Sequence, residues 1–193
     1  MRPMLLACLL VIWLTQAMAA QANIPPTQVV DLPQGNMYKL RSPDQRWLLV
    51  FEFSDYNSER RLWIVDNQSR KRRLVQTLNR SARLSWSPDS RRFFLNDAWG
   101  SNGTACWLIE PSTLGRVDVS ALIAKDHPGT FSNHRKAGHL YFEARRWVTS
   151  RALLVAMTGH FDERPADGFT YLFHVDLNDG VREVGETRQE EHQ

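Results

Sequence analysis

The sequence predicts an all-β protein: three four-stranded antiparallel meander repeats forming a partial or pseudo β-propeller. Two observations carry this prediction. The phrase Ser-Pro-Asp-x-Arg-aromatic occurs twice, in "RSPDQRWLLV" (41–50) and "WSPDSRRFFL" (86–95), 45 residues apart. Short apolar segments rich in aromatic and β-branched residues recur along the chain, bounded by Gly, Asn, Asp and Ser. Self-similarity at a fixed spacing indicates a repeat architecture.

The repeats are predicted at about residues 37–80, 81–120 and 138–185 of the 193-residue chain. In the first, "MYKLRSPDQRWLLVFEF" contains two strands, and "RLWIVDNQSRKRRLVQTL" contains two more after a polar loop. The second has the same order, "ARLSWSPDSRRFFLNDAW" and then "CWLIEPSTLGRVDVS". Each repeat is therefore expected to hold four antiparallel strands, with turns after the first, second and third.

The third repeat lacks Ser-Pro-Asp but keeps the rhythm of the others. Its strands are expected in "HLYFEARRWVTSRALLVAM" and, after the loop "TGHFDERPADG", in "FTYLFHVDLNDGVREV". All three repeats share an apolar run that ends in an acidic residue before a polar turn: Val65-Asp66, Ile109-Glu110 and Val175-Asp176. This shared phrase aligns the third repeat with the first two.

Ser-Pro-Asp-x-Arg indicates a tight turn between the first two strands of a repeat. Proline presets φ for the second turn position, and the Ser and Asp side chains hydrogen-bond to nearby backbone groups. Proline also lacks a donor for the sheet ladder, so it belongs between strands. In the third repeat, Asn178-Asp179-Gly180 has the residues of a tight hairpin.

The two Ser-Pro-Asp phrases resemble the Ser-Pro-Asp-Gly-Lys/Arg-x-Leu-x-Phe phrase of Tol-type and WD-repeat-like β-propellers. That group includes periplasmic TolB-like proteins and the propeller domains of prolyl oligopeptidases. The resemblance spans roughly residues 37–184 and is strong in the first two repeats and weak in the third. The chain departs from the phrase at its glycine, which is Gln45 in one copy and Ser90 in the other, and in the third repeat, which has Val148-Thr149-Ser150 instead.

The resemblance implies a propeller-like fold and a role as an interaction platform, as in TolB-like proteins. The catalytic residues of prolyl oligopeptidases lie in a separate domain for which this chain has no room, so that activity does not transfer. Propellers typically have four to eight blades, and three leave sheet edges to protect. We expect "TQVVDL" and a short helix in "SALIAKD" to cover edges of an open monomer; the alternative is association of two chains.

Residues 1–20 are predicted to be a secretory signal peptide, with Arg2, an apolar run from Met4 to Leu14, and then Ala17-Met18-Ala19. The run is shorter than the roughly 20 residues of a membrane span. An uncleaved anchor and lipidation at Cys8 are the alternatives. The sequence thus predicts a periplasmic or secreted bacterial protein with one domain (21–187) and a flexible tail (188–193).

The remaining cysteine, Cys106, lies in the apolar run "ACWLI" and is expected to be buried. Charge is nearly balanced, with 24 Lys and Arg against 21 Asp and Glu. The basic run "SRKRRL" (69–74) is interpreted as a solvated turn between strands, with an anionic membrane surface as the alternative ligand. No nucleic-acid motif accompanies the charge, so no nucleic-acid partner is predicted.

No catalytic residue, cofactor or metal site is predicted, and the chain is interpreted as a binding protein rather than an enzyme. The sequence contains no Gly-x-Ser-x-Gly elbow and no His-Glu-x-x-His signature. His134 and His139 are five residues apart in the insert, and His174 is expected to point outward from a strand. These histidines are interpreted as solvated residues without a shared role.

A binding face is predicted where the loops between the second and third strands of each repeat meet. In a propeller-like array equivalent loops emerge on one side, and Tyr and Trp are frequent anchors at protein interfaces. The predicted residues are Asp55, Tyr56, Asn57, Asp97, Trp99, Ser101, Asn102, His160, Phe161 and Asp162.

The expected partner is another envelope or secreted protein, with an inhibitor or immunity protein as one variant and self-association as another. The alternative is a glycan or small-molecule binding protein or hydrolase that uses loop carboxylates and aromatic residues. That alternative requires Asp55, Asp97 and Asp162 to converge in a pocket.

Overall fold

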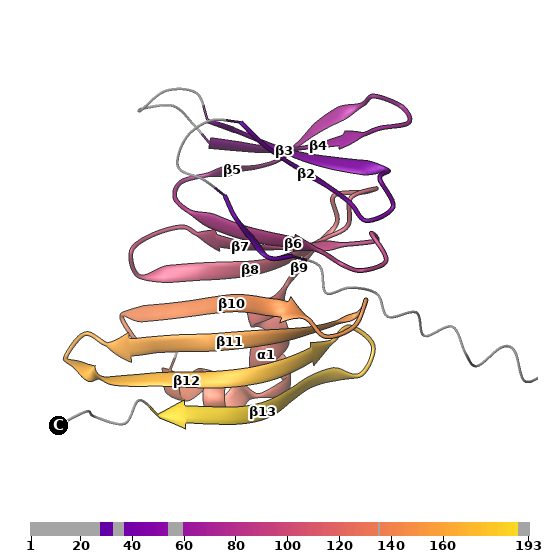
Figure 1. Cartoon of the computed structure of the whole chain (residues 1–193). Coiled ribbons are helices and arrows are strands. Elements are labelled where there is room, and N and C mark those ends of the chain that lie inside the picture. Colours follow the sequence, from indigo (N-terminus) through magenta and orange to yellow (C-terminus); the bar gives the residue numbers. More distant parts are fainter. Residues whose placement is uncertain (1–27, 33–36, 54–59, 135, 189–193) are drawn as a thin grey trace, which may run out of the picture.

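The computed structural model describes residues 28–32, 37–53, 60–134 and 136–188, and within them the backbone forms thirteen strands and two helices. Three consecutive groups of four strands each make an antiparallel meander. We call them blades 1, 2 and 3. Blade 2 lies between the other two (Figure 1). The predicted fold of three four-stranded meanders in an open, propeller-like arrangement is confirmed.

Blade 1 is the sheet of the first repeat. Its strands are β2 (Tyr38–Arg41), β3 (Trp47–Phe53), β4 (Arg60–Asp66) and β5 (Arg72–Leu78). They pair in chain order, so each strand lies beside the one that follows it. Leu49, Leu62 and Ile64 project from its two central strands into the core and are at most 1% exposed.

Blade 2 is the sheet of the second repeat. Its strands are β6 (Ala82–Trp86), β7 (Phe93–Ala98), β8 (Gly103–Ile109) and β9 (Arg116–Asp118). The short strand β1 (Val30–Asp31) pairs antiparallel with β6, and the Leu32 amide donates to the Ala82 carbonyl at 2.9 Å. The strand expected near the N-terminus therefore exists and covers the free edge of β6.

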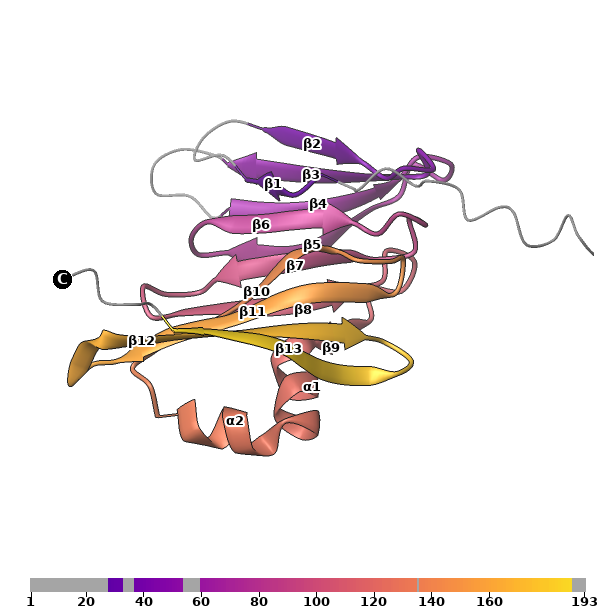
Figure 2. The ribbon, with the colours of Figure 1, turned by 60° about the horizontal axis from the view of Figure 1, so that its bottom comes forward.

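Blade 3 is the longest sheet and carries the two helices. Its strands are β10 (His139–Trp147), β11 (Ala152–Phe161), β12 (Arg164–Asp176) and β13 (Gly180–Arg188). The predicted helix in "SALIAKD" is α1 (Val119–Asp126), and α2 (Pro128–His134) follows it. Both helices lie against one face of blade 3 (Figure 2), where Val119 and Ile123 of α1 are fully buried.

The Ser-Pro-Asp turns have the same hydrogen bonds in blades 1 and 2. The Ser42 hydroxyl donates to Asp44 at 2.6 Å and accepts from the Trp47 amide at 2.9 Å. The Ser87 hydroxyl donates to Asp89 at 2.7 Å and accepts from the Arg92 amide at 3.0 Å. The repeated phrase is thus a local hydrogen-bonding unit that closes the first hairpin of a blade.

The residue after Asp in each of these turns has the left-handed backbone conformation. Its φ is 64° at Gln45 and 62° at Ser90. Glycine adopts this conformation without the steric cost that a Cβ atom adds. This chain has a residue with a Cβ atom at this position in both turns, so each turn contains a strained backbone conformation.

The core has two halves, one on each side of β7. Phe93 and Leu95 face blade 1, whereas Phe94 packs toward blade 3, and all three side chains are fully buried. Burial on both faces explains why the first half of β7, Phe93 to Leu95, is continuously apolar rather than alternating. Burying one such side chain stabilises the fold by roughly 1.5–3 kcal/mol.

Blades 2 and 3 are joined by a short parallel ladder and by side chains. Strands β8 and β10 pair in parallel at Gly103–Leu140 and Thr104–Tyr141. Farther along β10, the buried Asn96 side chain makes the hydrogen bonds that a neighbouring strand would make. It donates to the Ala144 carbonyl and accepts from the Ala144 amide, both at 2.9 Å.

Two expectations from the ends of the chain, the signal peptide (1–20) and most of the tail (188–193), fall largely outside the described residues. Within the described ranges, neither helix has the length and apolar character needed to cross a bilayer. Cys106 is fully buried, as predicted, and burial raises the pKa of its thiol to about 12.

Candidate functional site

The loops that connect the second and third strands of blades 2 and 3 emerge on the same side of the molecule, at the left in Figure 1. We call this side the loop edge and define it by the described segments Trp99–Asn102, Gly138–Tyr141 and His160–Glu163. The predicted residues Asp55, Tyr56 and Asn57 belong to the corresponding loop of blade 1, which lies outside the described residues.

Trp99 is the most exposed aromatic side chain of the loop edge that the structure describes, with 52% of its surface accessible. Its indole ring lies over Gly103, where any Cβ atom would overlap the ring. Trp99 and Asn102 also line a hollow of about 340 Å³, together with Gly138 and Leu140. An exposed ring held at the rim of a hollow is a suitable anchor for a partner.

A hydrogen-bonded chain connects the loops of blades 2 and 3. The Tyr141 hydroxyl donates to the Ser101 carbonyl at 2.7 Å, and the same hydroxyl oxygen lies 2.9 Å from His139 Nδ1. The Leu140 amide donates to the Asn102 carbonyl at 3.0 Å. Ser101 and Asn102 therefore act through their carbonyl groups to hold the start of β10.

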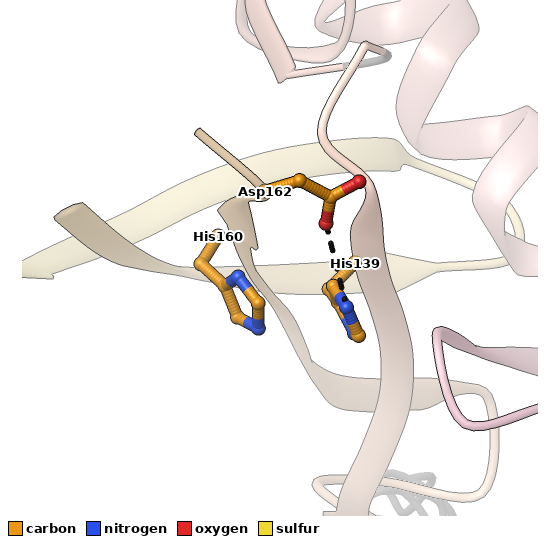
Figure 3. A group of neighbouring side chains, drawn as sticks. All are labelled: His139, His160 and Asp162. Atoms are coloured by element: carbon orange, nitrogen blue, oxygen red, sulfur yellow. Dashed lines mark ion pairs between the residues drawn. The ribbon is translucent and has the colours of Figure 1, made fainter. Parts of the chain in front are cut away.

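Two histidines and an aspartate gather at the blade 3 end of this chain. His139 begins β10, His160 lies near the end of β11, and Asp162 is in the turn that follows (Figure 3). The His139 and His160 rings stack with centroids 4.1 Å apart and planes inclined by 21°. His139 Nε2 lies 3.5 Å from Asp162 Oδ1. Donor atoms of all three residues lie within 4.8 Å of one another.

Strand register brings these residues together. His139 pairs directly with His160, so their side chains leave the sheet on the same face. A regular ladder counted from the Trp147–Leu153 pair would place Phe161 opposite His139 instead. The bulge between Ala144 and Arg146 shifts the register by one residue.

The sequence signals for this cluster were weak. His160 and Asp162 were predicted at the binding face, but His139 was grouped with His134, and no metal ligand was expected. His134 lies apart from the cluster in its interactions: its ring packs 4.1 Å from the Phe169 ring, and its Nδ1 lies 2.8 Å from the Thr130 carbonyl.

Two predicted residues of the binding face point away from a shared surface. Phe161 packs at the margin of the core, with its ring 6.2 Å from that of Phe169. Asp97 is only 8% exposed, and it accepts a hydrogen bond from Gln76 of blade 1. Burial raises the pKa of Asp97, against the opposing effects of the Gln76 hydrogen bond and the Arg116 charge.

The alternative function requires the predicted aspartates to converge. Asp97 faces blade 1, because it alternates with Asn96, whose side chain bonds to blade 3. Asp162 approaches His139 of blade 3. These two carboxyl groups therefore lie on opposite sides of β7, and the third, Asp55, is outside the described residues.

The basic run 69–74 is a turn followed by the start of β5, as interpreted from the sequence. Two of its charges have structural partners. The Arg72 guanidinium lies 4.1 Å from the centre of the Trp63 ring and 2.5 Å from Glu52. Arg73 donates to the Ser112 carbonyl of blade 2 at 2.9 Å. These contacts account for Arg72 and Arg73 without an anionic ligand.

No protein-family model and no curated protein matches this chain. Among solved structures, it is similar to the β-propeller domain of the Trilobed protease from Pyrococcus furiosus, described as having an open velcro topology. The identity is 12% and the TM-score 0.46, over 80% of this chain and 43% of that one. The chain thus spans less than half of the length of that solved chain.

Proposed function

We propose that this protein binds another protein through the loop edge and does so without catalysis. The observation that carries the proposal is Trp99, a half-exposed indole fixed over Gly103 at the rim of a hollow. Tryptophan is enriched among the few interface residues that supply most of the binding energy. Trp99 lies in the short connection between β7 and β8, and its contact with Gly103 already restricts its side chain, so binding costs less side-chain entropy.

The neighbouring groups suit a protein partner. The edge offers an exposed carboxylate at Asp162 and the part-exposed ring of His139, which surround the aromatic anchor with hydrogen-bonding groups. Most protein interfaces have this arrangement, an apolar centre with a polar rim. An inhibitor or immunity protein that occupies an enzyme's active site is one variant of this function.

We further propose that the chain belongs with TolB-like exported propellers and works in the bacterial periplasm or outside the cell. The support is the signal-peptide pattern of residues 1–20 and the Ser-Pro-Asp turns. N-terminal sequencing of the protein from fractionated cells tests the location. Cleavage after Ala19 or Ala20 with recovery in the periplasmic fraction supports it, and an intact N-terminus in the cytosol contradicts it.

Photo-crosslinking from the loop edge tests the binding function. A photoreactive amino acid at Asn102 captures a neighbour in living cells, and the same substitution at Leu74, an exposed residue of β5, is the matched control. The captured protein is then purified and its Kd measured. Trp99→Ala is expected to weaken binding about 30-fold, which corresponds to a hot-spot contribution of about 2 kcal/mol.

Leu74→Ala removes an exposed apolar side chain from a different part of the surface and is expected to leave the Kd unchanged. A partner whose affinity is the same for Trp99→Ala and for the unchanged protein contradicts the proposal. So does a set of crosslinks that is identical from Asn102 and Leu74.

A further inference from the structure

The hydrogen bonds around the cluster of His139, His160 and Asp162 determine which nitrogen of His139 carries a proton. The Tyr141 hydroxyl has one proton, which it donates to the Ser101 carbonyl at 2.7 Å. It must then accept at 2.9 Å from His139, so the Nδ1 atom of His139 carries a proton. In a neutral imidazole this leaves a lone pair on Nε2.

The Nε2 lone pair of His139 lies close to another acceptor, the Asp162 carboxylate. His139 Nε2 lies 3.5 Å from Asp162 Oδ1. The two atoms cannot hydrogen-bond directly to each other when both are acceptors, and a cation bound between them would contact both.

His160 provides an independent observation. Its Nδ1 is buried and has no hydrogen-bond partner among the described residues. A buried polar atom without a partner costs about 1–3 kcal/mol, and such atoms in native proteins frequently face a site that a water or an ion fills. A cation bound at this atom would remove this cost.

Gly138 permits the carboxylate to approach. A Cβ atom at this position would overlap the Asp162 carboxyl group. The glycine immediately before β10 therefore allows an acidic side chain from the β11–β12 turn to lie beside His139. The three groups come from three separate segments of blade 3, and the sheet holds them together.

We propose that His139, His160 and Asp162 bind one divalent first-row transition metal ion, of which Zn²⁺ is the reference case. Two imidazole nitrogens and one carboxylate oxygen suit zinc, nickel, cobalt or ferrous iron, whereas Ca²⁺ and Mg²⁺ require mainly oxygen ligands. The proposed metal site lies within the loop edge and shares His139 and Asp162 with it, but metal binding does not depend on the binding partner proposed above.

Binding requires the ligand atoms to move closer together and one of the two stacked histidine rings to turn, so that both lone pairs point at the ion. Bonds of about 2.0–2.2 Å place ligand atoms of a tetrahedral site about 3.3 Å apart, and the largest separation here is no more than 4.8 Å. The Asp162 side chain is 69% exposed in a turn and can move toward the histidines. The Tyr141 hydroxyl, hydrogen-bonded to His139 Nδ1, orients that ring as second-layer partners of metal sites do.

Three protein ligands leave one coordination position open to water or to a partner's side chain. Zinc sites with three protein ligands characteristically keep such a position.

Metal titration of the full chain without an affinity tag tests the proposal. Isothermal calorimetry with Zn²⁺ measures stoichiometry and affinity, and Co²⁺ absorption reports nitrogen and oxygen coordination. One ion per chain is expected. Asp162→Asn and His160→Ala are each expected to weaken Zn²⁺ binding at least tenfold, and Gly138→Ala is expected to do the same by displacing Asp162.

His174→Ala is the matched control, because it removes a partly exposed histidine of the same blade that lies outside the cluster. It is expected to leave Zn²⁺ binding unchanged. Asp162→Asn alters an exposed side chain, so circular dichroism should show an intact fold and its affinity can be compared directly. Absence of stoichiometric Zn²⁺ binding, or equal loss in His174→Ala and Asp162→Asn, overturns the proposal.

Discussion

Replacing Gln45 by glycine is expected to stabilise the protein. Gln45 has a φ of 64°, in the left-handed region, and its side chain is exposed. Its amide donates to the Ser42 carbonyl at 2.9 Å and its carbonyl accepts from Asn67 at 2.7 Å. Because both bonds use the backbone, the substitution preserves them.

The magnitude follows from two opposing contributions. A left-handed conformation costs a residue with a Cβ atom roughly 1–2 kcal/mol, and glycine loses about 0.5–1 kcal/mol more backbone entropy on folding. The net gain in the free energy of unfolding is therefore about 0.5–1 kcal/mol. For a domain of this size that raises Tm by roughly 1–4 °C.

The equivalent substitution at Ser90 is expected to have the opposite effect. Ser90 has a φ of 62°, but its side chain is 3% exposed and its hydroxyl accepts from the Asp44 amide of blade 1 at 2.9 Å. Glycine relieves the same strain but leaves that amide without its partner, at a cost of about 1–3 kcal/mol. Ser90→Gly should lower the free energy of unfolding by about 1 kcal/mol.

Urea denaturation followed by tryptophan fluorescence measures both variants, with Gln45→Ala as the control that retains the strain. Gln45→Ala should match the unchanged protein, because alanine also has a Cβ atom. The reasoning is refuted if Gln45→Gly is no more stable than Gln45→Ala, or if Ser90→Gly stabilises as much as Gln45→Gly. The first result would show that Gln45 is not strained. The second would show that the hydrogen bond from the Asp44 amide to Ser90 does not stabilise the protein.

Three further predictions use the same measurement or a simple chemical one. Asn96→Ala should destabilise the protein by about 2–4 kcal/mol, because it removes both hydrogen bonds to the Ala144 backbone; Asn96→Asp, which buries a carboxylate against the Ala144 carbonyl, should destabilise it at least as much at neutral pH. Since burial raises the pKa of Asp97, the folded state binds a proton more tightly than the unfolded state and stability falls as pH rises above the usual aspartate range. Asp97→Asn should flatten that dependence, and equal pH profiles from denaturation curves would contradict it. In a Cys8→Ser background, burial and a pKa of about 12 should keep Cys106 unreactive toward a thiol reagent at pH 8 until urea unfolds the chain; fast labelling of the native protein would show otherwise.

The placement of the loops was predictable in part. The loops after the second strands of blades 2 and 3 share a side, because equivalent turns of equivalent meanders do so, and Ser101, His160 and Asp162 lie in or beside them. Strand alternation was the weak point. Asp97 is the last residue but one of the buried strand β7 and faces blade 1, and the sequence alone did not distinguish that strand end from a loop.

The sequence by itself determined the blades. Apolar segments, the Ser-Pro-Asp turns and the acidic residues that end the third strands, such as Asp66, act over a few residues. The Asp66 carboxylate accepts from the Gln68 amide at 2.8 Å, and this bond, the largest contribution, holds its pKa below the usual value. Hydrogen bonds that form within one turn can be inferred from residues that are adjacent in the sequence.

Only the tertiary structure decided which distant side chains meet. The pairing of His139 with His160 depends on a one-residue bulge, and the junction of blades 2 and 3 depends on the Asn96 side chain replacing a strand. Side chains alternate between the faces of a strand, so a shift of one residue reverses every facing pair beyond it. The repeated pattern is local, whereas the register that assembles the His139, His160 and Asp162 cluster is a property of the whole sheet.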